Sequence, residues 1–255
     1  MTRTPIPSGI APGAAAVVGE RPRWRSVPGP FRGLVLWSVG LVWLTGCGGG
    51  GVAAVAPLAD PQSSLQALEA ETRPESPTRI FFDWSLTEEG VRVSGRGVAR
   101  VAPPDRARLD LFLSNGEAVA GAILIGDDLS LPVSLPGDIL PPPELLWGTI
   151  GTIRLGAGAR VIGGDELEDG GVRLTAALPD GESVRYEVLE GRVRRIEQLT
   201  SGGAVVKTLV ARHEATGRIP AEATYRDLTA FRELILTRDG MENVDGFPDD
   251  IWHYQ

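Results

Sequence analysis

The sequence predicts a mainly β domain with some α-helix, built around a long antiparallel meander. Apolar and polar residues alternate with a period of two from residue 78 onward, which is typical of strands with one buried and one wet face. Tight-turn residues such as Glu89-Gly90 and Asn115-Gly116 separate these segments, about ten residues apart. Two stretches lack this period: an expected helix before residue 74, and a proline-rich segment at 135–155.

Residues 1–46 have the pattern of a signal peptide. Arginines at positions 21–32 precede an apolar run at 34–44, which is shorter than the roughly 20 residues a membrane-spanning helix needs. A charged region followed by a short apolar region is typical of a secretory leader. The stretch before residue 21 is longer than such a leader needs and is consistent with a start codon further downstream.

The residues Leu44-Thr45-Gly46-Cys47 resemble the lipobox of bacterial lipoproteins. The resemblance implies cleavage after Gly46 and lipidation of Cys47, whose acyl chains would anchor the protein to a membrane. The alternative is an ordinary buried cysteine beside a hydrophobic helix. Gly48, in place of Asp, favours the outer membrane with the domain facing the periplasm.

We expect residues 47–57 to form a Gly-rich tether, because four consecutive glycines offer no side chains to pack. A single folded domain then spans residues 58–255. Its first element is a helix at 58–70, in which Asp60 caps the first turn, Pro61 suits the first helical position, and Leu65 and Leu68 share one face.

Nine later segments are predicted strands, separated by turn residues. They are residues 80–86, 91–101, 106–113, 118–125, 172–178, 184–188, 193–199, 205–210 and 232–237. Between the two groups of strands, the segment 135–155 contains Pro141-Pro142-Pro143 followed by Glu144-Leu145-Leu146-Trp147. We expect it to form a short helix or lid.

Composition and motifs argue against nucleic-acid binding, metal binding and catalysis. The net charge of −8 opposes contact with phosphates, and one Cys with two His leaves little for a metal site. A calcium-loop pattern near Asn243 and Asp245 fails, because Met241 and Trp252 occupy its first and last ligand positions. The acidic run at 165–169 could bind a cation but is more typical of a solvated hairpin tip. Without a nucleophile motif, we expect no enzyme and no cofactor.

The order of helix, meander and interrupting helical segment, behind a lipobox, resembles the lipoprotein-localisation superfamily. The resemblance covers most of residues 58–240, and the run from Arg96 to Asp110 matches its succession of sheet, proline turn and basic-apolar strand. It implies an incomplete barrel whose apolar concave face wraps a helical lid, with acyl chains held between them. The tail Asp245–Trp252 is not explained by the resemblance.

An apolar stripe supplies the candidate ligand-binding residues: Ile80, Phe82, Trp84, Leu109, Leu111 and Leu113. On adjacent antiparallel strands these side chains would share the concave face. The stripe is either plain core or the wall of a cavity that binds acyl chains or another apolar ligand. Such binding would serve the sorting of lipoproteins or the biogenesis of the envelope. The alternative function is a structural lipoprotein that docks an envelope protein complex and has no ligand cavity.

Overall fold

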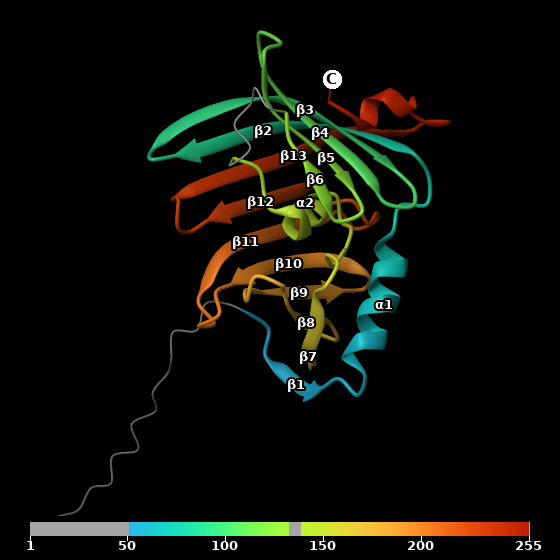
Figure 1. Ribbon diagram of the computed structural model, residues 1–255, viewed down its shortest axis with the longest axis vertical. Helices are drawn as coiled ribbons and strands as arrows, with labels where there is room; N and C mark the ends of the chain where they lie inside the picture. The colour runs from blue at the N-terminus through green and yellow to red at the C-terminus, as the bar shows by residue number, and fades with distance from the viewer. Residues whose placement is uncertain (1–50, 133–138, 255) are drawn as a thin grey trace, which may run out of the picture. The chain divides into compact units, whose positions relative to one another are not determined.

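The predicted strands join into one antiparallel sheet in the computed structural model, which describes residues 51–132 and 139–254 (Figure 1). Its order is β1-β7-β8-β9-β10-β11-β12-β13-β2-β3-β4-β5-β6. The bounds are β1 Ala54–Pro57, β2 Thr78–Glu88, β3 Val91–Ala102, β4 Arg106–Leu113, β5 Ala118–Ile125, β6 Asp128–Ser130, β7 Arg160–Leu167, β8 Val172–Ala177, β9 Ser183–Leu189, β10 Arg192–Leu199, β11 Val205–Arg212, β12 Glu222–Asp227 and β13 Arg232–Asn243.

The sheet is curved but not closed, because β1 and β6 at its edges are not paired with each other. This confirms the predicted incomplete barrel. Two meanders, β2–β6 and β7–β13, meet where β13 pairs with β2. By its contacts the chain divides into two units, Met1–Cys47 and Gly48–Gln255. All the described residues belong to the second unit, which has its own buried core.

Four strands were absent from the prediction: β1, β6, β7 and β12. Strand β1 corrects the expected tether, since Ala54 lies opposite Leu167 and Pro57 opposite Asp165 on β7. Residues 54–57 are therefore part of the sheet. The acidic run predicted as a hairpin tip likewise begins inside β7 and reaches the turn only at its end. These strands are short, or contain Gly163-Gly164, so their alternation is weak.

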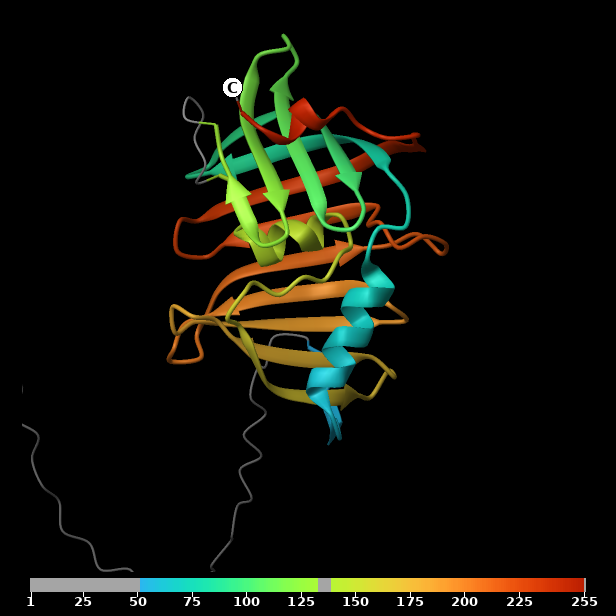
Figure 2. The same ribbon diagram turned by 45° about the vertical axis from the view of Figure 1, so that its right-hand side comes forward.

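Helix α1 (Pro61–Thr72) begins as predicted, with Pro61 in its first turn and Asp60 as N-cap. The Asp60 Oδ1 accepts a hydrogen bond of 3.0 Å from the Ser63 N–H. Leu65 is buried in the core, and the Thr72 hydroxyl donates to the Leu68 carbonyl oxygen at 2.8 Å. In Figure 2 the helix runs across strands of the second meander, near one end of each.

Helix α2 (Pro143–Thr149) lies in the segment that links β6 to β7, the helical segment predicted at 135–155. These strands lie towards opposite edges of the sheet, so the connecting chain must cross it. Figures 1 and 2 show α2 against the concave face, where it contacts β10, β11 and β12. The topology therefore places this helix inside the curve of the sheet.

The tail left unexplained by sequence packs on the outer face of β4. It forms a short 3-10 helix, η1 (Asp249–Trp252), in which Trp252 is buried. The Arg106 guanidinium lies 6.0 Å from the Trp252 ring centroid, and the Arg108 guanidinium lies 5.2 Å from that of Tyr254. Arg108 Nη1 also donates to the Ile251 carbonyl oxygen at 2.7 Å. The tail thus covers part of the outer face.

Candidate functional site

The predicted apolar stripe lies on one face of the sheet, but its two strands are not adjacent. Strand β3 lies between β2 and β4, which corrects the predicted pairing. The register gives three cross-strand rows: Ile80–Ala99–Leu109, Phe82–Gly97–Leu111 and Trp84–Gly95–Leu113. Large residues on β2 and β4 thus flank small residues on β3.

The glycines of β3 make room for the aromatic rings of β2. A Cβ atom on Gly97 would overlap the Phe82 ring, and one on Gly95 would lie 3.0 Å from the Trp84 indole. The Trp84 Nε1–H donates to the carbonyl oxygens of Arg96 at 3.0 Å and Phe112 at 3.1 Å. Both rings are therefore fixed across β3. This part of the stripe is filled by its own side chains.

Helix α2 covers the concave face and packs closely on it. Leu145, Leu146 and Trp147 are buried, and the Trp147 Nε1–H donates to the Gly126 carbonyl oxygen at 2.8 Å. A Cβ atom on Gly148 would overlap Ile196 on β10. Two voids lie beneath the helix, of about 20 and 10 Å³, each large enough for about one water molecule.

A larger cavity of about 330 Å³ opens where α1 ends, at the side of the sheet. We call it the mouth cavity. Apolar side chains from four segments line it: Ile80, Val101, Ile150 and Ile219. Ile80, Ile150 and Ile219 also line the 20 Å³ void, so the mouth cavity continues towards the space under α2. Its volume falls in the range of small-molecule sites.

Three arginines and one glutamate also line the mouth cavity: Arg73, Arg218, Arg238 and Glu75. Arg218 Nη1 donates to the Glu71 carbonyl oxygen and lies 3.5 Å from the Glu75 carboxylate. The Arg238 side chain is only 13% exposed and pairs with Glu214 at 3.0 Å. The cavity therefore combines an apolar wall with a basic rim.

Solved structures with a similar shape match most of this domain. A LolA superfamily protein from Nitrosomonas europaea has a TM-score of 0.52 at 13% identity, covering 79% of this chain and 99% of that one. An outer membrane lipoprotein-sorting protein domain from Vibrio parahaemolyticus has a TM-score of 0.51 at 10% identity, covering 76% and 97%. A DUF1329 family protein from Desulfovibrio piger also reaches 0.51, at 11% identity, covering 76% and 98%.

This chain has the LolA-superfamily fold. The identities are low enough that the likeness concerns the fold alone. No protein-family model and no curated protein matches the sequence.

Within the LolA-like fold, the six predicted ligand residues separate into two groups. Ile80 lines the mouth cavity, and Ile80, Phe82 and Leu109 line the 20 Å³ void. Leu111 has no exposed surface and lines neither the mouth cavity nor the voids. Trp84 and Leu113 instead border a hollow of about 790 Å³ with polar neighbours such as Arg92. The stripe therefore has open space at both ends: the apolar mouth cavity beside Ile80, and the polar hollow beside Trp84 and Leu113.

The alternation pattern had not singled out Arg238 and Ile219. Arg238 continues the alternation of Leu234 and Leu236 on β13, so an arginine occupies an apolar-face position. An arginine at a position where the alternation calls for an apolar residue is a signal that the sequence itself contains. Ile219 belongs to the loop between β11 and β12, where no periodicity exists.

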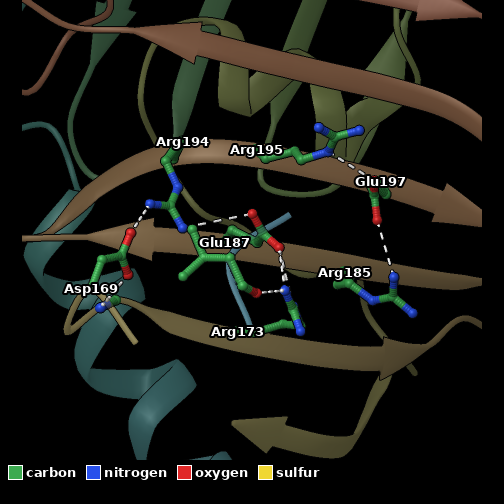
Figure 3. Close-up of polar contacts among 9 residues, drawn as sticks. Asp169, Arg173, Arg185, Glu187, Arg194, Arg195 and Glu197 are labelled. Atoms are coloured by element: carbon green, nitrogen blue, oxygen red, sulfur yellow. Dashed lines mark hydrogen bonds and ion pairs between the residues drawn. The ribbon is translucent and has the colours of Figure 1, made fainter. Parts of the chain in front are cut away.

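Ion pairs occupy the outer face of the LolA-like sheet at β8, β9 and β10. Figure 3 shows Glu187 between Arg173 and Arg194, and Glu197 near Arg185 and Arg195. The guanidinium groups of Arg173 and Arg194 lie 2.7 and 3.7 Å from the Glu187 carboxylate. The Glu187 side chain is 8% exposed. Each buried carboxylate is thus flanked by two guanidinium groups, which satisfies its charge without water.

The described residues contain no cluster of three or more metal-ligating side chains. The His213 Nε2–H donates a 2.7 Å hydrogen bond to the Val193 carbonyl oxygen, and burial lowers the pKa of His213. Since a carbonyl can only accept, the bonded Nε2 carries the proton. That histidine has a structural partner.

Within residues 51–132 and 139–254, no helix is both long and apolar enough to cross a bilayer. The lipobox Leu44–Cys47 lies outside the described residues.

Proposed function

We propose that this chain is a lipid-anchored lipoprotein of the cell envelope whose domain binds acyl chains or another apolar ligand through the mouth cavity. The observation that carries the proposal is the position of that cavity. It opens beside α1, has an apolar wall, and continues towards the face under α2. Because apolar concave pockets are the usual form of ligand sites, a chain-like ligand fits this geometry.

The LolA-like fold supports a role connected with envelope lipids. One structure of similar fold is described as a lipoprotein-sorting domain of the outer membrane. In this proposal Cys47 carries the anchor, and the domain lies in the periplasm at the outer membrane. The role is binding without catalysis.

Entry of a long ligand requires α2 to move. The two voids under the helix hold about one water each, so they cannot accept an acyl chain as they stand. The proline-flanked segment around α2 would have to shift away from β10 and β11. The mouth cavity would then admit the end of the chain before the helix is displaced.

The test is to purify residues 48–255 from cells without detergent and to measure bound lipid by native mass spectrometry. Uptake of a fluorescent fatty acid is then compared between wild type, Ile219→Trp and Ile162→Trp. Ile219 lines the mouth cavity, whereas Ile162 on β7 is 56% exposed and distant in the sheet order. We expect Ile219→Trp to block uptake and Ile162→Trp to leave it unchanged. Clean protein without uptake in wild type would contradict the proposal.

A second function is favoured by how little of the concave face is empty. The stripe residues and α2 fill most of it, as a structural core would. A domain of this kind would dock an envelope protein complex through its surface and need no ligand. The same experiment distinguishes the two functions, since this one expects no bound lipid and no uptake.

A further inference from the structure

We propose that the mouth cavity selects amphiphiles with an anionic headgroup, a phosphate or carboxylate, which Arg238 binds with help from Arg73 and Arg218. This inference rests on the proposed function and specifies the chemical class of its ligand. The Arg238 guanidinium group lies at the junction between the mouth cavity and the void under α2.

Arg238 lines both of those spaces. It lies opposite Phe82 in the register of β13 and β2, and its side chain is 13% exposed. A guanidinium held at an apolar face has lost most of its water, so it gains strongly from a negatively charged partner. The chain that enters beside Ile80 would bring its headgroup to this group.

The ion-pair partner of Arg238 can be displaced, and its other side-chain contact is a weak hydrogen bond of 3.3 Å to the Met241 Sδ. Glu214 lies 3.0 Å away, but its side chain is 65% exposed and belongs to the loop after β11. An exposed carboxylate on a loop contributes little to stability. A phosphate or carboxylate inside the cavity could therefore replace it, with two parallel hydrogen bonds to the planar guanidinium.

The rim supplies further positive charge at the entrance. Arg73 is exposed and has no ion-pair or hydrogen-bond partner among the described residues, and Arg218 is 49% exposed. Glu75 and Glu214 balance part of this charge, but both are largely exposed. Exposed arginines around a cavity mouth attract anions at low salt and much less above about 0.15 M, where the Debye length is roughly 8 Å.

The experiment measures dissociation constants by titration calorimetry for residues 48–255, which contain the whole described domain. The probes are 1-lauroyl-lysophosphatidate and 1-lauroylglycerol, used below their micellar concentrations, because they share the acyl chain and differ in the phosphate. Inorganic phosphate alone is the third probe. We expect wild type to bind the lysophosphatidate about tenfold or more tightly than the lauroylglycerol, as charged hydrogen bonds imply. Phosphate alone should bind far more weakly than either.

Variants then assign the selectivity. Arg238→Gln should reduce the preference to about twofold or less, while the exposed Arg160→Gln on β7 should retain it. If Arg238→Gln does not fold, Arg73→Gln combined with Arg218→Gln should lower the preference several-fold, since both side chains are exposed.

Equal affinity of wild type for the two lipids would overturn the headgroup inference and leave the proposed function standing. Binding of neither lipid would overturn the proposed function itself. Binding of inorganic phosphate as tight as that of the lysophosphatidate would overturn the inference as well, because the acyl chain would then play no part.

Discussion

Replacing Leu111 with Trp tests whether the predicted stripe is core or cavity wall. Leu111 has no exposed surface and lies in the row Phe82–Gly97–Leu111, where the Phe82 ring already occupies the space over Gly97. The nearby voids hold about one water each, so neither can accept an indole ring. We therefore expect overpacking, which costs about 1–3 kcal/mol.

Thermal unfolding of residues 48–255, followed by circular dichroism, measures this cost. For a domain of this size, 1 kcal/mol shifts the melting temperature by about 2–4 °C, so the variant should melt about 2–12 °C lower. Val91→Trp is the matched control, because Val91 is 67% exposed at the start of β3 and should tolerate the ring. If Leu111→Trp melts with wild type but loses uptake of a fluorescent fatty acid, the packing argument is refuted and the stripe is a cavity.

Three further predictions concern packing, charge and the anchor. Gly97→Ala should lower the melting temperature, because its Cβ would overlap the Phe82 ring, whereas Gly163→Ala, with no atom within 4 Å of its Cβ, should not. Burial raises the pKa of Glu144, so the folded state binds its proton more tightly than the unfolded state does. Its charge therefore destabilises the fold above the folded-state pKa, and this cost vanishes below the ordinary value of 4.5. Glu144→Gln should accordingly raise stability to urea at pH 7.5 and not at pH 4, and an equal gain at both would be contrary to the burial argument. Cys47→Ser should move the protein out of the membrane fraction and abolish labelling by an alkyne fatty acid; labelling that persists would disprove lipidation there.

The sequence predicted the sheet well where alternation was strong. Strands such as β2 and β4 have one buried apolar face and one more polar outer face, as their alternation with a period of two predicted. The sequence did not predict strands whose pairing depends on residues far away along the chain. Strand β1 has only four residues, and it exists because β7 offers an unpaired edge. No local pattern contains that information.

The candidate site was predicted in part for a related reason. Period two correctly placed Ile80 and Leu109 on the concave face, but it could not say that β3 lies between their strands. The residues Gly95, Gly97 and Ala99 were the missing signal, since small side chains at every second position indicate that neighbours cross over the strand. The mouth cavity depends on loops and on the crossing segment, so local periodicity does not predict it.

The crossing segment sets the energetic condition for any ligand that passes beyond the mouth cavity. Exposing the buried Leu145 and Leu146 would cost about 1.5–3 kcal/mol each, or about 3–6 kcal/mol together. An acyl chain recovers about 0.8 kcal/mol for each methylene it buries. Roughly four to eight methylenes must therefore be buried before displacement of α2 is offset, and the hydrogen bond from Trp147 to Gly126 adds to that requirement. Short chains should consequently occupy the mouth cavity alone, and only longer ones can replace the helix on the concave face.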